Sequence, residues 1–99
     1  MTYLLVRWLH EFTDEPILLY SEMDADRYET RKVEVFRGGR VGVAGEGVAH
    51  DKTRLGIVPV PPIEEIAADP EFTPREISRD EFEAIWLLAL RVAGSTSQC

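Results

Sequence analysis

The segment from Tyr3 to His10 is apolar on both of its faces, and this feature constrains the fold most strongly. In an extended strand, successive side chains point to opposite faces of the sheet. Large apolar residues then occupy each face: Leu4, Val6 and Trp8 on one, and Tyr3, Leu5 and Leu9 on the other. A strand with two apolar faces is typical of a sheet interior, because a half-exposed strand alternates with polar residues. We therefore predict a central strand over residues 3–10.

Turn-forming residues divide the following part of the chain into further short strands. Extended segments are predicted at Ile17–Glu22, Tyr28–Arg37, Val41–Ala44 and Leu55–Val58. Asp14-Glu15-Pro16 and Gly38-Gly39 supply tight connections, and short connections favour antiparallel pairing. The prolines that follow the last segment end it, because proline has no N–H to donate to a sheet.

Two helices are predicted in the C-terminal third of the chain. The first covers Pro62–Ala68 and starts with a proline, whose missing N–H is harmless in the first turn. The second follows the capping box Ser78-Arg79-Asp80-Glu81 and runs from Arg79 to about Ala93, with Gly94 as the residue that ends it. Its apolar stripe consists of Phe82, Ile85, Trp86, Ala89 and Leu90.

Strands followed by helices predict an α+β fold. The expected architecture is an antiparallel sheet of four to five strands, with a short helix and a longer C-terminal helix packed on one face. Residues 1–94 form a single globular domain in this prediction, and residues 95–99 form a flexible tail. The helices are expected to cover the Trp8 face, so that Trp8, Phe82 and Trp86 pack together.

The charge of the chain narrows the kinds of partner it can have. Eighteen Asp and Glu residues against eleven Lys and Arg give the 99 residues a formal net charge of −7. Nucleic acids and anionic membranes both attract cations, so this composition argues against either partner. A protein with a basic surface would be attracted, and its encounter with the chain would be faster.

Cysteine usage and the apolar runs predict a cytoplasmic protein. Cys99 is the only cysteine, so an intrachain disulfide is excluded. The longest fully apolar run, Ala84–Leu90, is too short to span a bilayer, and no signal segment is visible at the N-terminus.

A series of residues along the chain resembles a known family. The residues are Tyr3-Leu4, Trp8, His10, Asp14-Glu15-Pro16, Leu19-Tyr20-Ser21-Glu22, Arg31-Lys32-Val33-Glu34, Leu55-Gly56, Pro59-Val60-Pro61, Glu65-Ile66, Phe72, Ile77-Ser78, Phe82 and Trp86. In this order they resemble a family of small, stand-alone bacterial domains of unknown function, of actinobacterial type. The resemblance covers about residues 3–86 and implies a single-domain bacterial protein. It implies no activity and no catalytic residues.

The two histidines are the first candidates for chemistry. His10 is close in sequence to Asp14 and Glu15, and a histidine beside carboxylates can act as a general base. The alternative is that His10 ends a strand and that Asp14 starts the turn. His50-Asp51 matches the spacing of no metal-binding motif. We therefore predict no catalytic residue, no metal and no cofactor.

Arg31 lies in the one stretch where basic residues concentrate, Arg27–Arg40. Glu29 and Glu34 interrupt this stretch, so cross-strand ion pairs explain it more simply than nucleic-acid binding does. Arg31 is expected to be shielded, with Glu29 on its own strand face or Glu22 on the neighbouring strand as its partner. Alternatively, one guanidinium edge stays open and binds a small anion.

Two surfaces are candidates for binding a partner. One is an acidic cluster after the second predicted strand, and the other is the outward face of the first strand, where apolar residues surround Arg7. A homodimer that buries this apolar patch is the alternative. Together the predicted binding residues are Arg7, His10, Tyr20, Glu22, Asp24, Asp26 and Arg31.

These features predict a non-enzymatic, small acidic protein-binding module that docks on a protein with a basic surface. A neutraliser of a basic toxin or nuclease fits the size and the charge. The alternative is a small ligand-binding domain or enzyme with a polar site around His10, Tyr20, Glu22 and Arg31. A shared cavity at Arg31 and Glu22 would favour this alternative, and a flat acidic or apolar surface would favour docking.

Overall fold

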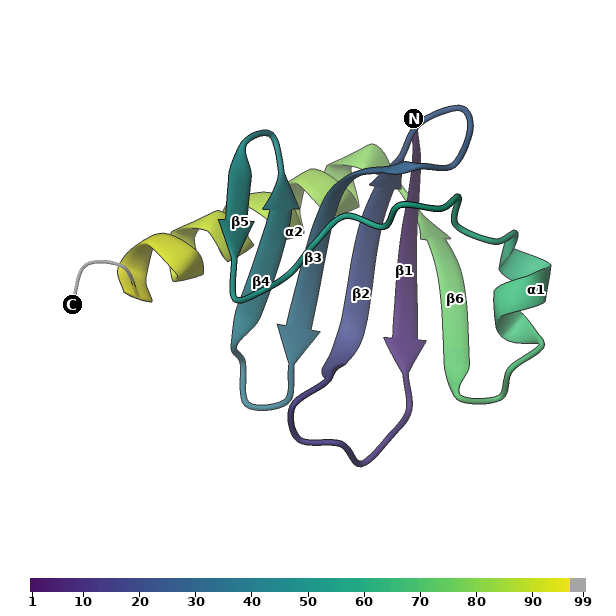
Figure 1. Ribbon diagram of the computed structural model, residues 1–99, viewed down its shortest axis with the longest axis horizontal. Coiled ribbons are helices and arrows are strands. Elements are labelled where there is room, and N and C mark those ends of the chain that lie inside the picture. The colour runs from purple at the N-terminus through teal and green to yellow at the C-terminus, as the bar shows by residue number, and fades with distance from the viewer. Residues whose placement is uncertain (97–99) are drawn as a thin grey trace.

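The computed structural model describes residues 1–96, which form one six-stranded antiparallel sheet and two helices (Figure 1). The elements are β1 Thr2–Trp8, β2 Pro16–Met23, β3 Glu29–Phe36, β4 Val41–Gly45, β5 Val48–His50, α1 Ile63–Ala67, β6 Phe72–Ile77 and α2 Arg79–Thr96. The strand order is β5-β4-β3-β2-β1-β6, and every neighbouring pair is antiparallel. The α+β class is confirmed, with six strands rather than four to five.

The central position predicted for the first strand is confirmed, because β1 pairs with β2 on one side and with β6 on the other. The strand predicted at Leu55–Val58 is wrong. The fifth strand is the short β5, and the sixth, β6, was missed because Pro74 and the charged residues around it resemble a loop. Proline is tolerated there because β6 is an edge strand, which has a neighbouring strand on one side only.

Residues 51–62, here called the strap, carry the chain from β5 at one edge of the sheet back to the other. Figure 1 shows the strap crossing the front of β3, β2 and β1 before α1, while α2 lies behind the sheet. Two side chains of β3 hold it down: Glu34 accepts a hydrogen bond from Thr53 Oγ1 at 2.8 Å, and Glu29 accepts one from the Gly56 N–H at 2.7 Å. Further along, Arg27 Nε donates to the Val60 carbonyl at 2.8 Å.

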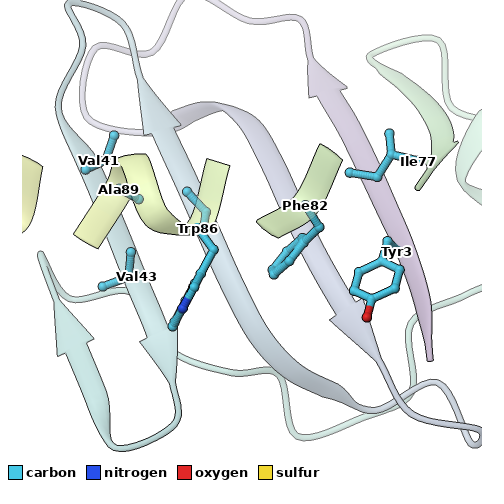
Figure 2. Packing of buried hydrophobic residues seen from close by; sticks show 8 residues of the cluster. Tyr3, Val41, Val43, Ile77, Phe82, Trp86 and Ala89 are labelled. Carbon is cyan, nitrogen blue, oxygen red and sulfur yellow. The ribbon is translucent and has the colours of Figure 1, made fainter. Parts of the chain in front are cut away.

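The two faces of the sheet are covered by different layers. On the face that α2 covers, the α2 face, Phe82, Trp86 and Ala89 pack against residues of the sheet such as Tyr3 and Val43 (Figure 2). On the opposite face, the strap face, the buried residues are Leu4, Val6 and Met23, packed by Leu19, Val60, Ile63, Ile66 and Phe72. The prediction that both helices pack on one face is therefore wrong.

This two-sided arrangement also overturns the predicted aromatic cluster. Trp8 alternates with Tyr3 and Leu5 along β1, so it lies on the strap face, where its ring contacts Phe72 at 5.8 Å. Phe82 and Trp86 stack on the α2 face with ring centroids 6.3 Å apart. The expected outward position of Tyr3 is likewise wrong, because α2 buries it.

A bulge in the β2–β3 pairing reverses one further prediction. Glu22 pairs with Arg31 and Met23 with Glu29, so that Thr30 has no opposite residue. The extra residue moves Glu29 from the face of Arg31 to the strap face, because each residue of register exchanges the two faces.

The capped start of α2 is confirmed, since Ser78 Oγ accepts a hydrogen bond from the Glu81 N–H at 3.1 Å. Its predicted end is not, because the helix continues through Gly94 to Thr96. Of the tail predicted at 95–99, residues 97–99 lie outside the described residues.

Replacing each of the two tryptophans by alanine should lower the free energy of unfolding by different amounts. Trp86 is 3% exposed and stacks on fully buried Phe82, so Trp86→Ala should cost about 3–5 kcal/mol and leave the chain largely unfolded. Trp8 is only half-buried at the edge of the other core, so Trp8→Ala should cost clearly less. Urea unfolding of both variants checks this, and equal losses would contradict the two-core arrangement.

Candidate functional site

Arg31 binds two carboxylates, one on each edge of its guanidinium. Its Nε and Nη2 donate to the Glu22 carboxylate at 2.9 and 2.6 Å, and its Nη1 and Nη2 donate to Glu83 at 3.1 and 2.7 Å. The group lies over the rings of Phe82 and Trp86, 5.0 and 5.2 Å from their centroids. The cluster therefore joins β2, β3 and α2 across the α2 face.

The same cluster shifts the pKa values of its members. The Arg31 guanidinium, with help from Thr30 and Tyr3 as hydrogen-bond donors, lowers the pKa of Glu22 from 4.5 to about 2, against burial, which raises it. Arg31 also lowers the pKa of Glu83. Burial raises the pKa of Tyr3, and its hydrogen bond to Glu22 raises it further. Glu22 is therefore ionised throughout the physiological range.

An open hollow of about 960 Å³ lies beside this cluster and is lined by both Glu22 and Arg31. The two residues thus share a cavity, as the alternative function required. Their polar edges face each other and Glu83, however, and bidentate pairing occupies both edges of the guanidinium. Of the two predicted partners, Glu22 is confirmed and Glu29 is wrong, because Glu29 contacts Ser21 and Lys32 instead. Glu83 was missed because its position, 52 residues away, leaves no local pattern.

Both ring nitrogens of His10 are occupied by the main chain. The Phe12 N–H donates to Nδ1 at 2.9 Å, which makes Nε2 the protonated nitrogen that donates to the Pro16 carbonyl at 2.8 Å. Within the described residues, the ring has no hydrogen bond to Asp14 or Glu15. His10 thus holds the β1–β2 loop together.

The remaining predicted residues lie apart from one another. Tyr20 is half-buried on the α2 face, and burial raises its pKa. Asp24 Oδ1 accepts the N–H groups of Asp26 and Tyr28 at 2.9 and 3.0 Å, so it shapes the β2–β3 turn, and Asp26 is exposed. Arg7 is exposed beyond the part of the α2 face that the helix covers. The structure therefore does not bring Glu22, Asp24 and Asp26 together as one exposed acidic cluster.

A separate cavity of about 420 Å³ lies on the strap face, and no part of it was predicted as a site. The sheet forms its floor, the strap and α1 form its sides, and Phe72 of β6 closes one end. Its apolar lining consists of Leu4, Val6, Leu19, Val60, Pro61, Ile66 and Phe72. The size and the apolar lining are those of a pocket that binds a ligand or a side chain.

One wall of this pocket is polar. Ser21 and Lys32 are direct neighbours across the β2–β3 pairing, and Glu29 lies beside both. Ser21 Oγ donates to Glu29 at 2.9 Å, and Lys32 Nζ lies 3.5 Å from Glu29 and 3.8 Å from Glu34. The ammonium is therefore held between two carboxylates, with contacts that are longer than ordinary hydrogen bonds.

Two exposed carboxylates, Glu65 and Asp69, line the mouth of the pocket and are here called the rim. Neither forms an ion pair with any residue in the range 1–96. Further acidic residues continue along α1 and into β6: Glu64, Glu71 and Glu76. Three basic residues lie nearby: Lys32 lines the pocket, Arg27 donates to the carbonyls of Val60 and Pro61 in its wall, and Arg75 pairs with Glu81 at 3.2 Å. The mouth of the pocket is thus acidic, although basic side chains lie in and beside its walls.

Only part of this pocket could have been predicted from the sequence. The acidic stretch that starts at Glu64 is visible in it, but the polar wall depends on the bulge that turns Glu29 to the strap face. Over residues 1–96 there is no group of three or more His, Cys, Asp or Glu side chains placed to hold a metal ion. In the same range, no helix is long and apolar enough to cross a membrane.

The fold and the pocket define an α+β domain in which one antiparallel sheet is covered by a helix on one face and by a strap and a short helix on the other. Residues 2–91 match the family described as "Domain of unknown function (DUF6881)", and the chain belongs to this family. The resemblance to a domain family of unknown function is thereby confirmed. No curated protein and no solved structure matches the chain significantly.

Acid titration of a Glu22→Gln variant tests the Arg31 cluster. The folded-state pKa of Glu22, about 2, is lower than its ordinary 4.5, so its charge stabilises the fold above about pH 4.5, and this contribution is lost as the pH falls toward 2. The shift is worth about 3 kcal/mol. Glu22→Gln should therefore lower the free energy of unfolding at pH 7 by roughly that amount, and the difference from wild type should shrink toward pH 2.

Urea unfolding from pH 7 to 2.5 measures this difference. Asp26→Asn, which alters an exposed carboxylate, serves as the control and should change little. A Glu22→Gln effect of constant size across this range would contradict the ionised, paired state of Glu22.

Proposed function

We propose that this chain is a non-enzymatic protein-binding module that docks on a basic partner through the pocket on the strap face. The observation that carries the proposal is the combination of an apolar pocket with two exposed rim carboxylates that form no ion pair within residues 1–96. An apolar centre with a charged edge is the usual anatomy of a protein interface. The rim supplies the charge that a basic surface would complement.

The charge of the chain supports the same partner chemistry. With a net charge of −7 and an acidic mouth to the pocket, the chain attracts cations at long range. Such attraction speeds the encounter of two proteins more than it strengthens the final complex. Salt reduces the effect, because exposed charges are screened beyond about 8–10 Å at physiological ionic strength.

Several observations weigh against the alternative, a ligand-binding or catalytic site around His10, Tyr20, Glu22 and Arg31. His10 lies in the β1–β2 loop, whereas Glu22 pairs with Tyr3 at the other end of β1. Both ring nitrogens of His10 and both edges of Arg31 already have partners. A site at these residues would first have to break the contacts that hold the fold.

We place this binding in the bacterial cytoplasm, where a basic toxin or nuclease is the class of partner that best fits the proposal. An acidic protein of this size can cover the cationic substrate-binding surface of such an enzyme and so neutralise it. A homodimer through the apolar surface around Arg7 is a separate hypothesis, and size-exclusion chromatography of the free protein addresses it.

Neutralising the rim should slow docking. The partner is first captured from the native host with the wild-type chain, identified and purified. Its association with Glu65→Gln/Asp69→Asn should be severalfold slower than with wild type at low salt, because the steering charge at the pocket is reduced. Biosensor kinetics at low and at physiological salt measure the rate.

The matched control is Glu11→Gln/Glu15→Gln, which removes the same two charges from exposed positions in the β1–β2 loop that do not line the pocket. It should leave the rate close to that of wild type. An equal decrease of the association rate in both double variants would show that the net charge, and not the position of the rim, controls the rate. A salt-independent rate in wild type would contradict electrostatic docking.

A further inference from the structure

We infer that the pocket binds an extended peptide segment of the partner, in which an apolar residue stands next to Lys or Arg. This inference rests on the proposed function and specifies what enters the pocket. The apolar side chain fills the cavity, the C=O and N–H of one residue bond to Lys32 and Ser21, and the basic side chain meets the rim. Each of these three contacts follows from a different part of the site.

Lys32 has hydrogen-bonding capacity that the residues in the range 1–96 do not use. Its side chain is only 17% exposed, yet its nearest carboxylate oxygens, on Glu29 and Glu34, are 3.5 and 3.8 Å away. An ammonium has three N–H donors, and a shielded donor favours an acceptor at ordinary hydrogen-bond distance. The side chain also lines the pocket, so an acceptor can reach it from the cavity.

The acceptor that suits Lys32 is a neutral carbonyl rather than a carboxylate. Glu29 and Glu34 flank the ammonium, so the three side chains together carry a net negative charge. A second anion placed there would be repelled by both carboxylates. A peptide carbonyl brings an acceptor without this repulsion.

Ser21 supplies the complementary group. Its hydroxyl proton is donated to Glu29 at 2.9 Å, so the oxygen has only acceptor capacity left. The wall thus offers a donor, Lys32, and an acceptor, Ser21, on neighbouring strands. One residue of an extended peptide presents its C=O and its N–H on the same side, as in a sheet. The wall complements this pair.

The rim then determines the neighbouring residue. Glu65 and Asp69 are exposed at the mouth of the same cavity and form no ion pair within residues 1–96, although Asp69 Oδ1 accepts the Glu71 N–H at 3.0 Å. In an extended segment successive side chains point to opposite sides and lie about 3.3 Å apart along the chain. A basic residue within one or two positions of the apolar one can therefore reach the rim while the apolar residue fills the pocket.

Selection from a library of random peptides displayed on phage tests this inference with the purified wild-type chain as bait. The expected result is enrichment of sequences with an apolar residue within two positions of Lys or Arg. Enriched peptides are then synthesised with both ends capped and titrated while the amide signals around Ser21, Lys32 and Ile66 are followed by NMR.

Three variants identify the contacts in these titrations. Glu65→Gln/Asp69→Asn should weaken binding about tenfold, Ser21→Ala should weaken it by a few-fold, and the control Glu11→Gln/Glu15→Gln should not change it. Melting curves establish that each variant is folded. If Ser21→Ala is unfolded, Lys32→Arg is titrated in its place. This variant tests the same polar wall, because it keeps the charge and changes the position of the donor.

Several results would overturn the inference. These are the absence of enriched peptides, enrichment of acidic sequences, or equal binding by the rim and control variants. Tighter binding of a short apolar acid than of its capped amide would point instead to a small-molecule site. The proposed function is tested separately with the whole partner. If that partner requires the rim but no peptide binds, only the inference of an extended segment is refuted.

Discussion

The central strand β1 has to be covered on both of its faces, and most of the architecture serves this requirement. Tyr3 and Leu4 are successive residues, and each is buried in a different core. The helix α2 can cover only one face, so the chain sends the strap and α1 across the other. The strap stays close to the sheet partly because Gly42 has no side chain where Thr53 lies. The pocket is a consequence of this cover, since the strap and α1 form its sides above the sheet.

Two neighbouring basic residues show how the two faces of the sheet differ in their polar contacts. Arg31 points to the α2 face, where carboxylates occupy both edges of its guanidinium. Lys32 points to the strap face, where its carboxylate contacts are long and its donors remain available to the pocket. The first arrangement is rigid and closed, as expected for a group that stabilises the fold. The second is incomplete, because both contacts of the ammonium are longer than ordinary hydrogen bonds.

Acidic residues contribute to this molecule in two distinct ways. Glu22, Glu29 and Glu34 are shielded and hold basic side chains or the strap, so they belong to the structure. Glu65 and Asp69 are exposed and form no ion pair within the described residues. The net charge therefore overstates the number of carboxylates that are available at the surface, and the proposed docking relies on the rim. Membership in a domain family of unknown function leaves the partner to be identified by this chemistry.

The sequence by itself determined the α+β class, the central place of β1, the capped start of α2 and the need of Arg31 for a carboxylate partner, with Glu22 and Glu29 as the two candidates. These features follow from local patterns: alternation along a strand, a capping box, and the need of a buried guanidinium for a carboxylate. Only the tertiary structure decided that the two helices lie on opposite faces, that Glu83 completes the Arg31 cluster, and that Glu29 joins Lys32 and Ser21. The last point depends on a single bulged residue, Thr30, which exchanges the two faces of β3. Sequence periodicity cannot locate such a bulge, because the partner strand, rather than the local pattern, sets where the pairing skips a residue.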